Sequence, residues 1–345
     1  MGVSFVTLTR DNAPALEAVL PEVWAHHWRD EFARKVVEWR YWSRPAGGTR
    51  LALDGGRCVG LIDCFVRPYL VAGRTVLVRE SCDWWAEPEH RPAGLGLRLM
   101  RQLMATGDPI VSIGGSAVNC ALLPRLGWRW LGDVERWILP LTARDSVAML
   151  LRRRRREGLA RLVPRRIPIR RLRATPPPSM DARVREWRPG DGTPGPPPDG
   201  GGLASLVQEA DLHWLAAAPP ELIEIESLTY SVGGEPCGFA VTQLEPTPAG
   251  GEGKIVHLQV ARESAELLGW MVTEAVRRLA GRGAGIVRAR SASPVLATAL
   301  RSAGFLAIRR EPVYWWGPDS PPQGAPLYLS YLRADDAIPF AAARG

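Results

Sequence analysis

The chain has 345 residues, is 46% hydrophobic and 23% charged, and carries a formal net charge of +8. This composition is typical of a globular protein of about two domains, and it lacks the roughly 18-residue apolar run of a membrane helix. The five cysteines form no CxxC pair and have no nearby His, which argues against a disulfide frame and against a zinc site. Because "MGVSFVTLTRDN" lacks the layout of a secretory signal, we expect a cytoplasmic protein with reduced thiols.

The basic charge is concentrated in one segment. Residues Arg152–Arg173 contain eleven Arg and one acid, a net charge of +10, so the remainder of the chain carries −2. A Pro/Gly-rich stretch with little to bury follows this segment. We therefore predict a first domain at 1–145, a basic and Pro/Gly-rich linker at 146–202, and a second domain at 203–345. We interpret Arg152–Arg156 as a solvated or disordered tract, with contact to an anionic membrane or nucleic acid as the alternative.

The first half favours an α/β fold, because strands come first and a strand–loop–helix–strand unit follows. The expected elements, in chain order, are helices at 13–28 and 31–41, strands at 49–53, 58–66 and 74–85, a helix at 94–105, a strand at 109–113, a short helix at 119–126, and strands up to 141. Tryptophans recur at helical spacing in the first two helices, which is typical of core or inter-domain packing; a pocket for an aromatic, lipidic or sugar substrate is the alternative.

The two halves of the chain resemble each other. "DGGRCVGLIDCFV" has a counterpart in "VGGEPCGFAVTQL", since each is a Gly-Gly turn followed by an apolar strand with an internal Gly. "LLPRLGWRWLGDVERWILPL" has a counterpart in "ALRSAGFLAIRREPVYWWGP", in which a helix ends at Gly plus an aromatic residue. The matched features lie about 177 residues apart in the same order. This pattern predicts a duplicated domain.

The segment "EPEHRPAGLGLRLMRQLM" (Glu87–Met104) places an Arg and two glycines at the start of an amphipathic helix. A helix start offers unpaired N–H donors and a positive dipole end, so the segment predicts an anion site. Glycine allows a bulky ligand to approach the backbone, and Arg91 would add charge-assisted contacts. The spacing is not the G-x-G-x-x-G of a dinucleotide-binding fold.

The pattern R-x-x-G-x-G, formed by Arg91, Gly94 and Gly96 between a strand and a helix, resembles the acyl-CoA-binding motif of the GNAT acetyltransferase superfamily. "NCALLPRLGW" resembles that family's next helix, so the resemblance covers roughly 5–141, with a degenerate copy at about 202–340. It implies an α/β fold of two GNAT-like domains, each a mixed β-sheet flanked by helices, and acetyl-CoA or another acyl-CoA as cosubstrate, without a metal. The cofactor-binding residues that it implies are Trp84, Trp85, Ala86, Arg91, Ala93, Gly94, Leu95, Gly96 and Asn119.

The sequence departs from the family pattern in three places. Pro92 has no N–H, so one phosphate donor is lost. Leu123 stands where many members have a tyrosine that protonates the leaving thiolate, and Leu300 occupies the matching position of the second half. The second half keeps Arg262 but lacks the Gly-x-Gly pair. We therefore expect CoA in the first half only, with the second half completing the substrate cleft or stabilising the first.

Two carboxylates on the strand at 74–85 are candidates for the catalytic base. The resemblance implies direct transfer, in which a base takes the ammonium proton of the acceptor. Glu80 and Asp83 are three residues apart, so in a regular strand they face opposite sides and only one reaches the acceptor. We favour Glu80, with Asp83 second. The alternative is a structural salt bridge between either acid and Arg79 or Arg67.

These observations favour an acyl-CoA-dependent N-acyltransferase, with an amine-bearing small molecule or polymer precursor as acceptor. One alternative is a non-catalytic GNAT-like scaffold or CoA-binding protein, which Leu123 and the degenerate copy suggest. Another is a peptidoglycan-type aminoacyl transferase; the basic linker would suit its tRNA substrate, but the intact CoA motif argues against it.

Overall fold

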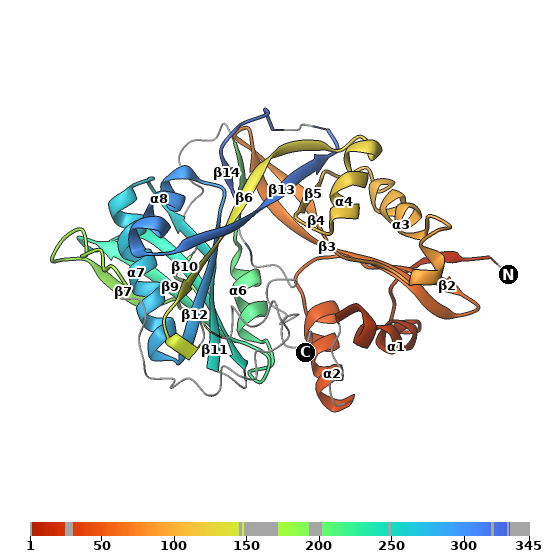
Figure 1. Ribbon diagram of the computed structural model, residues 1–345, viewed down its shortest axis with the longest axis horizontal. Helices are drawn as coiled ribbons and strands as arrows, with labels where there is room; N and C mark the ends of the chain where they lie inside the picture. Colours follow the sequence, from red (N-terminus) through yellow and green to blue (C-terminus); the bar gives the residue numbers. More distant parts are fainter. Residues whose placement is uncertain are drawn as a thin grey trace.

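The computed structural model describes residues 2–24, 30–144, 147, 172–192, 202–247, 250–318, 321–329 and 331. Its central feature is one sheet that runs through the whole molecule (Figure 1). Fourteen strands of the described chain belong to it, in the order β1-β2-β3-β4-β5-β13-β6-β12-β11-β10-β9-β7, with β8 paired to β3 and β14 paired to β8. The mixed α/β fold predicted from the sequence is confirmed.

The first half of the chain, 2–144, supplies the strands of one end of the sheet. Its strands are β1 (Ser4–Thr7), β2 (Arg50–Asp54), β3 (Arg57–Val71), β4 (Arg74–Ala86), β5 (Ile110–Ile113) and β6 (Arg129–Pro140). Its helices are α1 (Ala13–Trp24), α2 (Asp30–Val37), the π-helix η1 (Glu38–Trp42), the 3₁₀ turn η2 (Pro88–His90), α3 (Leu95–Met104), α4 (Ala117–Leu122) and the 3₁₀ turn η3 (Pro124–Leu126). The region expected to hold strands up to 141 forms one long strand, β6, which spans both halves of the sheet.

The second half, 172–331, supplies the other end. Its strands are β7 (Arg183–Glu186), β8 (Leu203–Ser205), β9 (Glu224–Val232), β10 (Glu235–Thr247), β11 (Gly250–Val260), β12 (Ala284–Ser291), β13 (Leu306–Trp316) and β14 (Leu327–Tyr328), and its helices are α6 (Glu209–Ala216), α7 (Ala265–Gly281) and α8 (Pro294–Ala303). The linker prediction did not anticipate β7, which pairs with β9. The Arg-rich run lies outside the described residues, apart from 172 and 173.

The two halves exchange their last strands. β13 of the second half lies between β5 and β6 of the first, while β6 pairs on its other side with β12 of the second half. Ile113 of β5 lies opposite Val313, and Arg136 of β6 lies opposite Arg290. Each of these pairs maps onto the other by a shift of 177 residues, the spacing found in the sequence. The duplication therefore appears in the structure as two pseudo-symmetric halves that complete each other's sheet.

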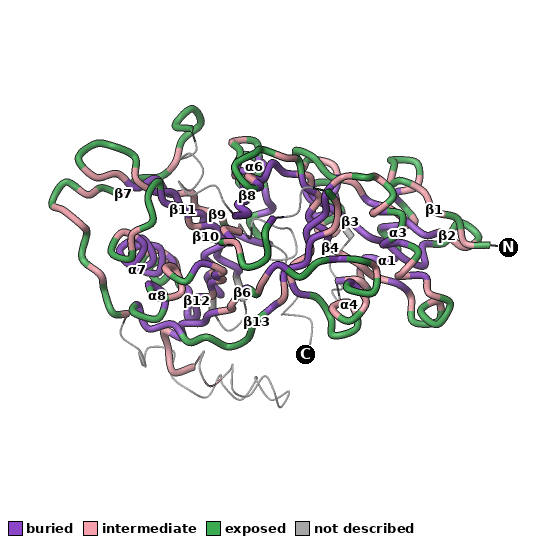
Figure 2. The backbone as a smooth tube through the Cα atoms, turned by 90° about the horizontal axis from the view of Figure 1, so that it is seen from above, coloured by how far each residue is buried: buried purple, intermediate pink, exposed green. Residues whose placement is uncertain are grey.

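Three groups of helices cover the sheet. α3 packs on β2, β3 and β4 and closes a core cluster with Leu99 and Met100. α7 and α8 pack together over β10–β12, and α7 is buried over Leu268–Val276, as Figure 2 shows. Burial on most sides is typical of a helix in the interior of a protein, so α7 is enclosed by its neighbours. α1, η1 and α6 share a third cluster that extends across both halves. Among the described residues, no helix is long and apolar enough to span a membrane.

Candidate active site

The predicted anion site lies at the start of α3. Gly94 is the N-cap residue, with a φ of 72°, and no side chain caps the helix. The first turn of α3 contains no acid. Amides in the first turn of a helix have no partner within the helix, so they are directed at whatever lies beyond the helix end. The structure therefore presents an uncapped helix start at the glycine motif.

The surroundings of the two glycines differ. A Cβ atom at Gly94 would meet nothing within 4 Å, so the space over this residue is open. A Cβ at Gly96 would lie 3.4 Å from Nε1 of Trp84, whose indole N–H donates a hydrogen bond of 2.9 Å to the Gly96 carbonyl. Trp84 thus ties the end of β4 to the first turn of α3. Of the other predicted residues here, Leu95 is buried, Ala93 is exposed, and Asn119 follows the Ser116 cap of α4.

Arg91 connects this helix start to the same strand. Its Nε donates a hydrogen bond of 2.8 Å to the carbonyl of Ala86, the last residue of β4. The residue is exposed, so the rest of its guanidinium faces solvent beside the helix start. Arg91 therefore lies where a side chain could bind an anion at the start of α3.

β4 and β5 separate beside this helix start. They pair in parallel at Arg79–Ile110 and Glu80–Val111 only; beyond these pairs β4 continues along β3, while β5 continues along β13. Asp83 interrupts β4, because it has a φ of 43° and lies where the register between β3 and β4 shifts. Such a bulge bends a strand away from its partner. Trp84, Trp85 and Ala86 follow the bulge, at the edge of the gap.

Glu80 is the last residue of β4 that pairs with β5, so it lies where the two strands part. Its side chain is fully buried, and the hydroxyl of Tyr69 donates a hydrogen bond to its Oε1. Arg79, one of the two expected ion-pair partners, binds Asp108 instead, with its Nη2 2.6 Å from Oδ2. The other, Arg67, lies 3.7 Å from Asp211.

Asp83 belongs to a buried ionic pair. Its Oδ2 accepts hydrogen bonds from Arg40 and from the hydroxyl of Tyr41, at 3.2 Å for the latter. The side chains of Arg40 and Asp83 are 0% and 3% exposed. Burial first, and then the charge of Asp83, raises the pKa of Tyr41, which therefore remains a hydrogen-bond donor.

The expectation that Glu80 and Asp83 face opposite sides of the sheet is wrong. Tyr69 and Tyr41, which hold them, belong to the same core cluster, on the face that α1 and η1 cover. The bulge at Asp83 breaks the alternation of a regular strand and turns the second carboxylate onto the face of the first.

A third acid, missed in the sequence, completes this buried cluster. Asp63 of β3 accepts two hydrogen bonds from Arg44, at 2.7 and 2.9 Å, and one from Thr49 at 2.7 Å. Cys82 of β4 lies 3.6 Å from the same carboxylate. Arg40 lies within η1 and Arg44 follows it, and the only available signal in the sequence was two arginines in a strongly aromatic stretch.

Leu123 is fully buried in the core beneath α3 and α4. Because it is a leucine, this position offers no hydroxyl. Tyr314 of the exchanged strand β13 belongs to the same cluster, and its hydroxyl donates a hydrogen bond of 3.2 Å to the carbonyl of Cys120 in α4. Burial raises the pKa of Tyr314. The tyrosine hydroxyl that contacts α4 therefore comes from the second half of the chain.

One group of possible metal ligands occurs among the described residues, at Glu87, Glu89 and His90 beside the glycine motif. Glu87 already accepts hydrogen bonds from Arg57, one of them at 2.9 Å, and lies 3.0 Å from Nδ1 of His90. The Arg57 hydrogen bonds lower the pKa of Glu87. A cation at this position would compete with a bound guanidinium, and we assign no metal to it.

The second half starts its equivalent helix differently. Ser264 caps α7, accepting a hydrogen bond of 3.3 Å from the Leu267 amide, and Glu266 lies in the first turn. The Ser264 hydroxyl takes an amide that an anion would need, and the negative charge of Glu266 opposes the binding of an anion at this helix start. The contrast between α3 and α7 agrees with the loss of the glycine pair in the second copy.

Comparison with known proteins shows what the sequence and the fold are similar to. Residues 10–108 match the model of the acetyltransferase (GNAT) family. No curated protein matches the sequence. A GCN5-related N-acetyltransferase from Anabaena variabilis has a similar structure, with a TM-score of 0.59 at 12% identity over 91% of this chain and 72% of that one.

Two further solved structures have the same arrangement. Saccharomyces cerevisiae N-myristoyltransferase with bound myristoyl-CoA gives a TM-score of 0.56 at 11% identity, over 91% of this chain and 82% of that one. A tandem GNAT protein from the clavulanic acid biosynthesis pathway gives 0.55 at 14% identity, over 91% and 98%. At such identities the structures show the fold alone. The structures therefore show that the chain has the tandem GNAT fold, and residues 10–108 also match the GNAT family in sequence.

Proposed function

We propose that this protein is an acyl-CoA-dependent N-acyltransferase that binds its acyl-CoA in the first half. The observation that carries the proposal is the uncapped start of α3 at Gly94, with open space over it and no acid in its first turn. α7, at the equivalent place in the second half, is capped by Ser264 and carries Glu266. Of these two helix starts, only that of α3 leaves its first-turn amides without a side-chain cap and so offers them to a pyrophosphate.

The gap between β4 and β5 gives the rest of the cosubstrate a path. In this proposal the pyrophosphate lies on the amides of Ala93, Leu95 and Gly96, with Arg91 beside it, because the Gly94 amide donates to the Arg91 carbonyl at 2.9 Å. The pantetheine arm pairs with the backbone of Trp84–Ala86, which β5 leaves unpaired on that side, and Asn119 borders the opposite wall. The thioester then arrives where the two strands meet, at Glu80. Acetyl-CoA is the simplest donor, and a longer acyl-CoA would use the same backbone.

Glu80 is the proposed base. Its position at the junction of the strands supports this role, and Tyr69 orients its carboxylate. Taking a proton from the acceptor ammonium frees the amine to attack the thioester carbon, so that the C–N bond forms and the C–S bond breaks. The nitrogen then gives up a second proton, which passes through water to the leaving thiolate, because Leu123 has no hydroxyl. Asp83 remains the second choice, since Arg40 and Tyr41 already occupy its Oδ2.

Calorimetric titration with CoA tests the site. Gly94→Asn should weaken CoA binding by tenfold or more, because Asn tolerates a positive φ but its side chain covers the open amides. Gly107→Asn is the matched control: Gly107 follows the other end of α3, with a φ of 79° and equally open surroundings. It should leave binding and melting temperature unchanged. A wild type that does not bind CoA, or equal binding by the two variants, would refute the proposal.

A non-catalytic CoA-binding protein is the second candidate. The buried leucines at positions 123 and 300, and the complete burial of Glu80, favour it. Release of free thiol from acetyl-CoA in the presence of an amine library separates the two. CoA binding with acylated product supports the enzyme, whereas binding with no product across the library supports the scaffold.

A further inference from the structure

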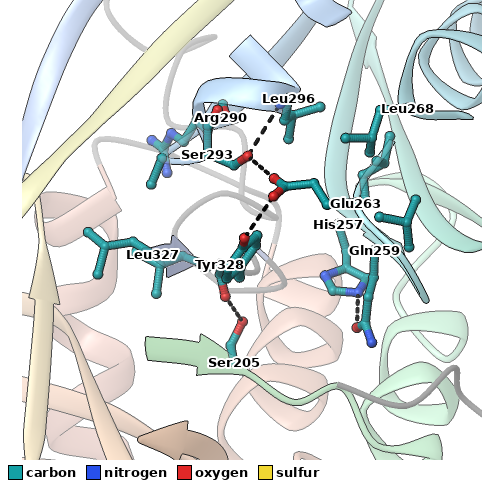
Figure 3. A pocket seen from close by; sticks show the side chains of 15 residues that line it. Ser205, His257, Gln259, Glu263, Leu268, Arg290, Ser293, Leu296, Leu327 and Tyr328 are labelled. Atoms are coloured by element: carbon teal, nitrogen blue, oxygen red, sulfur yellow. Dashed lines mark hydrogen bonds between the residues drawn. The ribbon is translucent and has the colours of Figure 1, made fainter. Parts of the chain in front are cut away.

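A pocket lies in the second half, where β11 and β12 separate. The two strands pair in parallel as far as Ile255 and Ala289 and then diverge. The space between them, about 600 Å³ including its open mouth, extends to α7, α8, β8 and β14 (Figure 3). It lies apart from the glycine motif of the first half, and the proposed acyl-CoA site uses none of its residues.

The walls of this pocket are mostly apolar. Five leucines from four segments line it: Leu258, Leu268, Leu296, Leu327 and Leu329. A concave apolar surface with a few converging polar groups is the usual form of a small-molecule site. The walls therefore fit a hydrocarbon body.

Two buried polar side chains of β11 also line the pocket. Nε2 of His257 lies 3.2 Å from Oε1 of Gln259, and both residues are more than nine-tenths buried. Burial lowers the pKa of His257 to about 4, so its imidazole is uncharged at neutral pH. The histidine thus adds hydrogen-bonding capacity to the pocket without a positive charge.

A carboxylate is held at the mouth. Glu263 accepts hydrogen bonds from the hydroxyls of Ser293, at 2.7 Å, and Tyr328, at 3.1 Å, as Figure 3 shows. Ser293 is itself fixed as the N-cap of α8. Both donors are uncharged hydroxyls, so they orient the carboxylate without forming an ion pair with it.

No Lys or Arg in the described part of the chain forms an ion pair with Glu263. Arg290, which also lines the pocket, shares Glu311 with Arg136 and Arg309, at 3.4 Å in its own case, and stacks over the ring of Tyr331 at 4.9 Å. Glu263 therefore places one negative charge at the mouth, and a ligand cation bound to it would be attracted.

We propose that this pocket binds an apolar molecule that carries a primary ammonium group, with the ammonium on Glu263 and the hydrocarbon body against the leucines. The ligand is either a second substrate or an effector. Binding here does not depend on the acyl-CoA function proposed for the first half, so the two proposals fail separately.

Three probes of equal length test the charge preference: hexylamine, hexan-1-ol and hexanoate. Ligand-detected NMR measures the binding of each probe to the full chain. Hexylamine should bind about tenfold more tightly than hexanol, because an ammonium–carboxylate hydrogen bond is stronger than a neutral one. Hexanoate should bind most weakly. The advantage of the amine should shrink with added salt, since Glu263 is exposed.

Glu263→Gln keeps an oxygen for Ser293 and Tyr328 but removes the charge, so the amine and the alcohol should bind within twofold of each other. Glu266→Gln is the matched control, because it removes one exposed acid three residues away and outside the pocket lining. It should preserve the tenfold preference. Equal binding of amine and alcohol to the wild type, a preference that survives Glu263→Gln, or its loss in Glu266→Gln would overturn the proposal.

Acetyl-CoA distinguishes the two kinds of ligand. An N-acetylated amine detected by mass spectrometry, and lost in Glu263→Gln, supports an acceptor site. An amine that binds with the Glu263-dependent preference but is recovered unmodified supports an effector site. Failure of every probe to bind overturns the proposal whether or not CoA binds to the first half.

Discussion

Trp39 and Trp214 form a reciprocal pair across the two halves of the molecule. Their rings stack with centroids 4.8 Å apart and an interplanar angle of 7°. The indole N–H of Trp39 donates to the carbonyl of Trp214 at 2.8 Å, and that of Trp214 donates to the carbonyl of Trp39 at 2.9 Å. Both residues are 3% exposed. The two halves therefore meet in a reciprocal contact between η1 and α6.

Trp39→Ala should lower the free energy of unfolding by about 3–5 kcal/mol, because it leaves a large cavity and removes the hydrogen bond that the Trp39 indole donates. Urea denaturation of the full chain measures the change. Trp130→Ala serves as the control: Trp130 is 45% exposed, so its loss should cost less than about 1 kcal/mol. In a cycle with Trp214→Ala, the double variant should lose clearly less than the sum of the single losses. Additive losses would show that the pair does not act as a unit.

Glu80→Gln should reduce turnover by about 10²–10⁴-fold and leave CoA affinity unchanged, because the carboxylate lies beyond the pyrophosphate site and acts only as the base. Steady-state kinetics and CoA titration on the same preparation check both parts. Asp83→Asn is the comparison, although removing one partner of a buried ion pair costs about 3–5 kcal/mol, so its folded fraction must be measured first. Normal turnover in Glu80→Gln with loss in folded Asp83→Asn would move the base to Asp83.

The segments 1–145 and 203–345, expressed separately, should not give stable monomers. Each would expose strand edges that the exchange covers in the full chain, since β13 pairs with both β5 and β6. Co-expression should restore a one-to-one complex. Size-exclusion chromatography with light scattering distinguishes the outcomes, and a monomeric, cooperatively folded 1–145 would show that the exchanged strand is dispensable.

The buried His257 predicts a loss of stability in weak acid. Because its pKa is lowered to about 4, the unfolded chain, with a pKa near 6.5, binds the proton more readily than the folded protein between these values. This contribution is fully present above pH 6.5 and is lost as the pH falls toward 4, at up to about 1.4 kcal/mol per pH unit. His257→Gln should remove that part of the slope in urea denaturation from pH 7 to 4.5. His213→Gln, at an exposed histidine, should keep it.

Local patterns predicted much of the first half. The helix after the glycine motif and the strand before it were found because apolar spacing and turn residues are short-range signals. The duplication was visible for the same reason. The strand exchange could not be predicted, since the repeat does not reveal which half supplies the neighbour of β5.

The chemistry of the site was harder to predict. Nothing in "ESCDWWAE" announces a bulge at Asp83, although Asp adopts a positive φ more readily than most residues. The burial of Arg40 was equally hidden, because charged residues are mostly exposed and only the finished fold brings Asp83 to its guanidinium. Pairing between distant segments decides both features.

The strand exchange also determines when the first half can complete its sheet during synthesis. Ile113 of β5 pairs with Val313, which leaves the ribosome two hundred residues later. At about 5–20 residues per second, the nascent first half waits roughly 10–40 s with one edge of β5 uncovered. During that interval the strand that borders the proposed pantetheine path lacks its lateral support. A nascent chain stalled before β13 should therefore bind CoA poorly even though every residue of the glycine motif has already emerged.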